Sequence, residues 1–524
     1  MLAIVVLSSA LVSGGWLVQR GLVGGGGTRS ADRARLFDEV YRHVSREYVD
    51  TLSDSILYTR AAEGLVQELG DPHSSYLSPA VLARLSERTS GKYVGVGVQI
   101  DVRDGWITVV TPLPGGPAIE AGIQAGDRIT EMDGKPIHAQ ALDEAQKALR
   151  GAPGSVMRLT IERPGVSAPL KFALTRREIR TQSVQHGALL RDGVGYVALT
   201  IFSEASAPEL QRTIDSLRAA GMKSLIFDLR GDPGGLLGQG VAIADLFLDP
   251  GQRIVSLRGR TPDASHAYTD RAGQPWPQMP VALLVDSNSA SAAEIVAGAL
   301  QDHDRALLVG TTTYGKGSAQ NVFPLPNGGA VKLTTARWYT PSGRSINRPR
   351  PSDDGGGMPK SDSAARPRFT TDGGRTVLGG GGITPDILLP ADSAPRGELA
   401  FQRALGKQIP QFRSALTEYA LSLKNAHAVT SPNFAVTPAM RAELRRRMLV
   451  RGIAVDSGTM DAARSLIDRQ LGYEIARDVF GTPAEYARRL RDDPAVTRTV
   501  SILAGAATQA DLLKRATASS GPRS

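Results

Sequence analysis

Ser224-Leu-Ile-Phe-Asp-Leu-Arg-Gly-Asp-Pro-Gly-Gly235 joins a short apolar run to a glycine-rich turn. An apolar run without polar alternation is typical of a strand buried on both faces, and the Pro-Gly-Gly sequence ends it. Similar runs lie at 194–201 and 281–286, and a helical pattern at 209–220 separates the first two runs. Strand, helix, strand and glycine loop in this order predict an α/β core with parallel strands.

Ser291 and Lys316 are the residues of this core that carry chemistry. Ser291 opens a helix of small, apolar residues directly after the strand at 281–286, and Lys316 lies between two glycines after the strand at 306–309. A serine nucleophile needs a base that removes its proton. Lysine can be that base only if it loses water, which lowers its pKa from about 10.4 toward neutrality. The pair therefore predicts a hydrolase that needs no catalytic histidine.

The same segments offer backbone N–H groups to an oxyanion. The N–H of Ala292 directly follows the nucleophile, at a helix N-terminus whose dipole favours negative charge. The loop at 232–235 follows the carboxyl end of a strand, where open α/β sheets place their sites. The alternatives are a helix-capping role for Ser291 and a place on the solvated surface for Lys316.

Between about 90 and 180 the apolar pattern changes to a period of two. Strands at 94–100, 106–110 and 157–162, with a helix at 142–149, predict a small sheet domain with one main helix.

This order of elements resembles a PDZ domain. Gly122-Ile-Gln-Ala-Gly-Asp-Arg-Ile129 is similar to the Gly-Leu-x-x-Gly-Asp-x-Ile segment of that family. The resemblance implies a carboxylate-binding loop formed by Tyr93, Val94, Gly95, Val96, Gly97 and Val98. Glycines let backbone N–H groups converge on a terminal carboxylate, and a peptide can then add as an edge strand. The alternative is a glycine-rich hairpin without a ligand.

Four motifs resemble those of the carboxyl-terminal processing (tail-specific) proteases. They are Phe227-Asp-Leu-Arg-Gly-Asp-Pro-Gly-Gly-Leu236, Ser289-Ala-Ser-Ala-Ala-Glu-Ile-Val-Ala-Gly-Ala-Leu-Gln-Asp302, Gly315-Lys-Gly-Ser-Ala-Gln320 and Tyr339-Thr-Pro-Ser-Gly-Arg344. The resemblance implies a nucleophile at Ser291, a base at Lys316, a lysine-orienting residue at Gln320, and oxyanion donors at Gly235 and Ala292. Family members cut proteins near disordered carboxyl termini, and their PDZ domain captures or gates the substrate tail.

The fold expected from this resemblance is an α/β protease core of the ClpP/crotonase-like class with an inserted PDZ domain. We expect five segments: an N-terminal membrane anchor or signal, a helical region, the PDZ domain, the protease core and a helical C-terminal extension. Their predicted bounds are 1–24, 31–89, 90–180, 181–392 with a flexible loop at 348–381, and 393–524.

Asp302 and the histidines are poor candidates for catalysis. If residues 291–302 form one helix, Asp302 lies about 16 Å from Ser291 along the axis, so we assign it a structural role, such as capping or pairing with Arg305. His303 fails as a base for the same geometric reason. His266 lies in a polar loop with no partner pattern, and His73 is expected to be structural.

The first eighteen residues are uncharged and apolar, just long enough for a membrane span, and a glycine run follows at 24–27. No basic start or clear cleavage site accompanies them, which favours an uncleaved anchor over a cleaved signal. We therefore expect a bacterial envelope protein, periplasmic or otherwise extracytoplasmic.

Composition excludes several other functions. The chain has no cysteine, which rules out disulfides and thiolate chemistry, and no histidine cluster or phosphate loop that would imply a metal or other cofactor. The net charge is +9, and residues 395–524 carry +8 of it, with 20 Lys and Arg residues and 12 Asp and Glu residues. Without a nucleic-acid motif, this tail is interpreted as a solvated helical surface that is free to form a homo-oligomer.

The predicted function is a serine endopeptidase that binds and cleaves proteins near flexible C-terminal tails. The alternative is a catalytically silent PDZ scaffold that holds envelope proteins by their C-termini.

Overall fold

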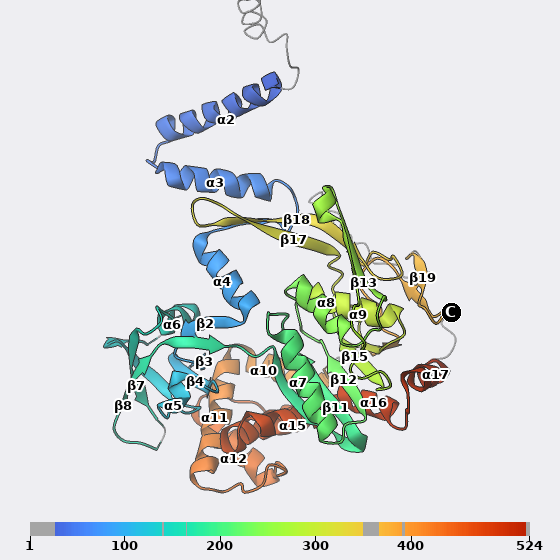
Figure 1. Ribbon diagram of the computed structural model, residues 1–524. Coiled ribbons are helices and arrows are strands. Elements are labelled where there is room, and N and C mark those ends of the chain that lie inside the picture. The colour runs from blue at the N-terminus through green and yellow to red at the C-terminus, as the bar shows by residue number, and fades with distance from the viewer. Residues whose placement is uncertain (1–26, 139–140, 164, 349–365, 390–393, 520–524) are drawn as a thin grey trace, which may run out of the picture. The chain divides into compact units, whose positions relative to one another are not determined.

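The computed structural model describes residues 27–138, 141–163, 165–348, 366–389 and 394–519, which divide into two compact units (Figure 1). One unit takes its described residues from the chain up to 80 and from 320–334. The other takes its residues from 81–319 and from 335 onward.

The smaller unit contains two helices and parts of three strands. The helices are α2 (Gly27–Glu47) and α3 (Asp54–Gln67), and the strands are β1 (Ser75–Leu77), β17 (Ser318–Pro324) and β18 (Ala330–Tyr339). Ser74 donates to the Asp71 carboxylate at 2.6 Å and accepts from the N–H of Thr334 at 3.0 Å, so the 71–74 turn sets the antiparallel pairing of β1 with β18.

A six-stranded sheet forms the centre of the larger unit. Its order is β10-β11-β12-β15-β16-β21, with β10 antiparallel to β11 and every other pair parallel. The strands are β10 (Val184–Leu189), β11 (Val194–Leu199), β12 (Ser224–Asp228), β15 (Val281–Val285), β16 (Leu307–Gly310) and β21 (Ile387–Leu388). The predicted parallel pairing of the apolar runs is confirmed.

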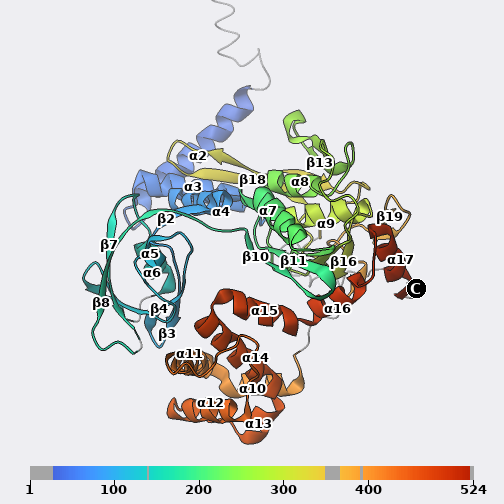
Figure 2. The same ribbon diagram turned by 60° about the horizontal axis from the view of Figure 1, so that its bottom comes forward.

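Both faces of this sheet are buried, which explains why its strands are continuously apolar. On β12, Leu225 and Phe227 join a core with α7 (Ser206–Ala219), α8 (Leu237–Asp245) and α9 (Ala292–Asp302). Ile226 belongs to a different core, which it shares with residues of α16 (Pro494–Leu503) and α17 (Gln509–Ser519). Figure 2 shows these two helices beside the strands of the sheet.

The C-terminal extension is therefore part of the core as well as a helical bundle of its own. Its other helices share a separate apolar core, except that the apolar residues Tyr486 and Leu490 of the last of them, α15 (Thr482–Asp492), join the core of α16 and α17. These other helices are α10 (Arg396–Leu405), α11 (Ile409–Asn425), α12 (Pro438–Val450), α13 (Ser457–Ala462), α14 (Arg464–Ile475) and α15. A homo-oligomer formed through this extension stays a prediction.

Asp493, which caps α16, links the extension to the loop after β12. Its carboxylate accepts from the N–H of Ala495 at 2.8 Å and from Arg230 Nη2 at 2.8 Å. Arg230 also binds Asp228 at 2.6 Å. The extension thus contacts the residue that leads into the 232–235 glycine loop.

Leu503→Ala is expected to lower the free energy of unfolding by about 2–5 kcal/mol, because Leu503 is buried against the central sheet and its loss leaves a cavity. Thermal unfolding followed by circular dichroism measures the change. Thr497→Ala, on the exposed face of the same helix, is the control. Equal midpoints for the two variants would contradict the role of α16 as a cover for the sheet.

Residues 98–175 form a second sheet with its own core. Its path is β3-β4-β5-β7-β8, so β3 (Val98–Arg103) is an edge strand, and β6 (Lys135–Pro136) pairs with β5. The other strands are β4 (Trp106–Pro112), β5 (Arg128–Met132), β7 (Val156–Glu162) and β8 (Leu170–Thr175). The helices are α5 (Pro117–Glu120) and α6 (Leu142–Leu149). Outside this sheet, β2 (Lys92–Gly95) pairs with β9 (Arg177–Arg180).

A helix and a pair of strands also belong to the larger unit. Helix α4 (Pro79–Ser90) belongs to it from residue 81 onward, and β13 (Arg253–Gly259) pairs with β14 (His266–Thr269) and with residues 336–339 of β18.

The flexible loop predicted at 348–381 needs correction. Strands β19 (Arg368–Thr370) and β20 (Thr376–Leu378) form a hairpin, because Arg366 binds the carbonyls of Gly379 and Gly382 and thereby fixes the end of the segment. Residues 349–365 lie outside the described residues.

The predicted anchor at 1–24 also lies outside the described residues. None of the helices in the described part of the chain is both long and apolar enough to cross a membrane.

Candidate active site

Ser291 stands at the turn between β15 and α9 in a strained backbone conformation. Its φ and ψ are 57° and −115°, a region that residues other than glycine rarely adopt. Such strain persists only where surrounding contacts enforce it, and it is concentrated at functional sites. A sharp strand-to-helix turn of this kind presents a serine hydroxyl at the end of a sheet.

Glu294 connects the Ser291 turn to the Lys316 loop. Its buried carboxylate accepts four hydrogen bonds: the N–H groups of Ser291 and Lys316 at 2.9 Å each, the N–H of Gly315 at 2.7 Å, and the hydroxyl of Thr313 at 2.6 Å. Burial raises the pKa of the Glu294 carboxyl, and these donors act in the opposite direction.

The two catalytic candidates are close together as a result. The N–H groups of Ser291 and Lys316 donate to the same oxygen, Oε2, so their nitrogens lie at most twice 2.9 Å apart, or about 6 Å. Residues separated by 25 positions in the sequence are thus joined through one carboxylate.

The glycines beside Lys316 allow its loop to pack closely against residues 346–348. A Cβ on Gly315 would lie 2.9 Å from the Cβ of Arg348, and a Cβ on Gly317 would lie 2.9 Å from the N of Asn347. Trp338 Nε1 donates to the Lys316 carbonyl at 3.1 Å. The lysine backbone is therefore held on both sides, and its side chain is half-buried.

The 232–235 loop lies against the Ser291 turn. A Cβ on Gly234 would come within 2.6 Å of the Ala290 carbonyl and 2.9 Å of both Ala292 N and Ser291 Cβ. The N–H of Ala290 donates to the Asp232 carbonyl at 3.0 Å. These contacts place the loop that contains Gly235 beside the turn at residues 290–292, and the role of Gly235 and Ala292 as oxyanion donors stays a prediction.

Gln320 belongs to the smaller unit, unlike Ser291 and Lys316. It lies on β17, and its amide donates to the Thr334 hydroxyl at 3.1 Å. Its action on the lysine stays a prediction.

A groove of about 390 Å³ lies between the edge strand β3 and helix α6. Four residues of the predicted carboxylate-binding loop line it, namely Tyr93, Val96, Gly97 and Val98. Val94 and Gly95 do not line it, although they follow Tyr93 on the same strand, β2, which pairs with β9. An edge strand beside a groove is the arrangement that adds a peptide as a further strand.

Comparisons with known proteins identify the family to which this chain belongs. The sequence model of Peptidase family S41 matches residues 193–354, and that of the PDZ domain matches residues 108–163. The carboxy-terminal-processing protease of Bartonella bacilliformis is 39% identical over 314 residues, which cover 59% of this chain and 71% of that protein. The chain belongs to peptidase family S41.

Two other proteins are also similar to this chain. The carboxy-terminal processing protease CtpA of Bacillus subtilis is 34% identical over 59% of this chain and 66% of that protein. A solved photosystem II D1 C-terminal processing protease is 29% identical, with a TM-score of 0.37 over 71% of this chain and 96% of that one.

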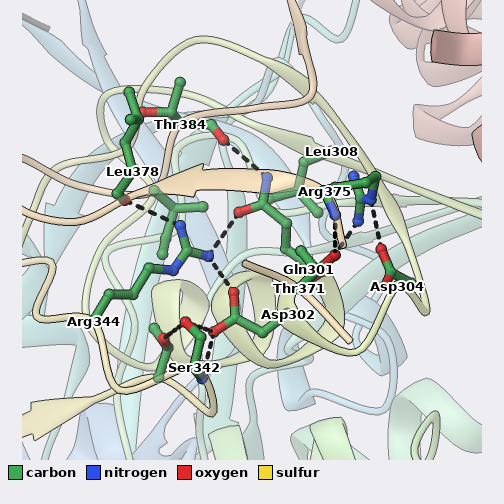
Figure 3. Close-up of polar contacts among 12 residues, drawn as sticks. Gln301, Asp302, Asp304, Leu308, Ser342, Arg344, Thr371, Arg375, Leu378 and Thr384 are labelled. Atoms are coloured by element: carbon green, nitrogen blue, oxygen red, sulfur yellow. Dashed lines mark hydrogen bonds and ion pairs between the residues drawn. The ribbon is translucent and has the colours of Figure 1, made fainter. Parts of the chain in front are cut away.

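Asp302 of this S41 chain has a structural role, but its partner is not Arg305. Figure 3 shows Asp302 bound to Arg344, at 2.6 Å, and to the N–H and hydroxyl of Ser342. Both charged side chains are buried, at 1% and 0% exposed. Arg305 instead donates to the carbonyls of Met279 and Trp276, because it lies beyond the end of α9.

Two of the histidines considered from the sequence make contacts with residues other than Ser291 and Lys316. His303 contacts the Asp372 carboxylate and the Arg253 carbonyl, each at 2.7 Å. His266 is the first residue of β14, and its ring lies edge-on to that of Tyr268.

Sequence reasoning missed Glu294 as a residue of the S41 site. A signal was present, since Glu294 is the only charge in the otherwise apolar stretch from 292 to 300. A charge that a helix buries among alanines requires partners, and here the partners are the serine and lysine segments.

Proposed function

We propose that this S41 chain is a serine endopeptidase in which Ser291 is the nucleophile and Lys316 the general base. The observation that carries the proposal is the pair of hydrogen bonds from Ser291 and Lys316 to one oxygen of Glu294. The strained Ser291 backbone adds to it.

In the proposed reaction, Ser291 Oγ attacks the scissile carbonyl carbon while Lys316 Nζ takes its proton. The N–H groups of Gly235 and Ala292 donate to the oxyanion. Collapse of the intermediate breaks the peptide bond, and the leaving amine takes the proton from Lys316. Water, deprotonated by Lys316, then attacks the acyl carbon, and the bond from that carbon to Ser291 Oγ breaks. Oγ takes the proton back from Lys316, which restores both residues. Gln320 is proposed to orient the lysine.

The substrates are proposed to be proteins with flexible C-terminal tails. The names of the relatives support this class, and the groove beside β3 offers a place for an added strand. A relation of the core to the ClpP/crotonase-like folds is also part of the proposal.

Localisation to the bacterial envelope, with residues 1–24 as the anchor, is proposed from the uncharged apolar sequence at the N-terminus.

Ser291→Ala and Lys316→Ala are both expected to abolish cleavage of a fluorogenic peptide that ends in an unstructured apolar tail. Lys316→Arg tests whether Lys316 acts as a base or only as a positive charge. Arginine keeps its proton, so this variant is expected to be as inactive as Lys316→Ala. Circular dichroism checks that each variant folds.

The scaffold alternative gives a different result in the same assay. It predicts that the wild-type protein binds the peptide with no turnover, and that Ser291→Ala binds it equally well. Turnover that survives Ser291→Ala would overturn the proposed nucleophile.

A further inference from the structure

Asp232 is a buried acid inside the loop that is proposed to hold the oxyanion. Its side chain is fully buried, three positions before Gly235. Oδ1 accepts from the N–H of Gly234 at 2.7 Å, and the Asp232 carbonyl accepts from the N–H of Ala290 at 3.0 Å. Oδ2 is buried and has no hydrogen-bond partner among the residues that the structure describes.

This environment disfavours the ionised form of the acid. A buried carboxylate oxygen without a donor loses its hydration and gains nothing in return, whereas a neutral acid loses much less. Burial raises the pKa of the Asp232 carboxyl to about 8, although the Gly234 N–H and the positive charge of Arg88 act in the opposite direction.

The charged groups around the loop do not compensate a negative Asp232. Arg88 comes from α4, and its charge acts without an ion pair to Asp232 among the described residues. Arg230, at the start of the loop, already binds Asp228 and Asp493. Asp286 and Glu294, on the segments before and after Ser291, are acids themselves.

Catalysis gives a second reason for a neutral acid at this position. The tetrahedral intermediate places negative charge against the N–H groups of the same loop and of Ala292. A carboxylate in that loop would repel the developing charge in a site that water screens poorly.

We propose that Asp232 is a positioning residue that must carry its proton for the reaction to proceed. As a neutral acid it holds the 232–235 loop against the Ser291 turn. When it ionises at alkaline pH, it opposes the oxyanion and stops turnover. The inference builds on the proposed function and assigns that site an alkaline limit.

The sign of the pH dependence separates Asp232 from Lys316. A lysine base is active when deprotonated, so its contribution to activity increases as the pH rises. Asp232 is active when protonated, so its contribution decreases through about pH 8. The two groups together give a bell-shaped profile.

The test compares kcat/KM for the tailed fluorogenic peptide in the full chain, in Asp232→Asn and in Asp263→Asn. Asparagine is isosteric and cannot ionise, whereas Asp263 is an exposed acid that controls for the loss of surface charge. Both proteins keep Lys316, so its titration changes kcat/KM of both in the same way. At each pH, kcat/KM of Asp232→Asn divided by that of the wild type therefore reports on Asp232 alone. From a pKa of about 8, this ratio is expected to rise about 30-fold between pH 7 and pH 9.5.

A ratio that stays constant over this range would overturn the inference, as would a folded Asp232→Asn variant that is inactive at every pH. If Asp232→Asn does not fold, Asp232→Ser, which also cannot ionise, must show the same loss of the alkaline limb. Failure of the proposed function is recognised separately, because cleavage would then persist in Ser291→Ala or be absent from the wild type at every pH.

Discussion

Glu294→Gln is expected to lower kcat for peptide hydrolysis by about 10²–10³-fold with little change in KM. The substitution is isosteric, but the four partners of Glu294 all donate hydrogen bonds, at 2.6–2.9 Å. A glutamine turns an NH2 group toward two of these donors, so the Ser291 turn and the Lys316 loop separate. Substrate binding in the groove at β3 is unaffected, which is why the loss is expected in kcat.

Steady-state kinetics with the tailed peptide measures this effect, and the rate at which a fluorophosphonate labels Ser291 reports on the nucleophile directly. Glu204→Gln, an exposed residue, is the matched control. A folded Glu294→Gln protein with kcat within twofold of wild type would show that the carboxylate does not hold the pair together.

Asp302→Ala is expected to lower the free energy of unfolding by about 3–5 kcal/mol. Removal of the carboxylate leaves the Arg344 guanidinium buried and without its ion-pair partner. Its other hydrogen bonds go to the uncharged Gln301 side chain and the Leu378 carbonyl, and the charge of Asp386 acts on it in addition. Burial already lowers the pKa of Arg344, which reports the cost of keeping that charge inside the protein.

Denaturant unfolding measures the loss of stability. The double variant Asp302→Leu/Arg344→Met is expected to recover it, because neither buried charge is then left without a partner. Activity per folded molecule is expected to remain within a few-fold of wild type. A stable Asp302→Asn protein without activity would instead indicate that Asp302 takes part directly in catalysis.

The sequence alone was enough to predict the order of the core elements and the candidate nucleophile. The apolar runs at 224–228 and 281–285 are buried strands of a parallel sheet, and Ser291 stands at the start of the following helix. Such features are local, because periodicity and turn residues report on the neighbouring backbone. The glycines beside Lys316 were also visible, although the residues at 346–348 that require them were not.

Partners distant in the sequence were decided only by the tertiary structure. Asp302 pairs with Arg344 rather than with the nearby Arg305, and Glu294 joins Ser291 to Lys316. The apolar face of α16 covers the central sheet, although the sequence allowed a solvated surface for the whole tail. Periodicity shows that a side chain is buried, but the identity of its partner depends on how the segments pack, and that information is not local.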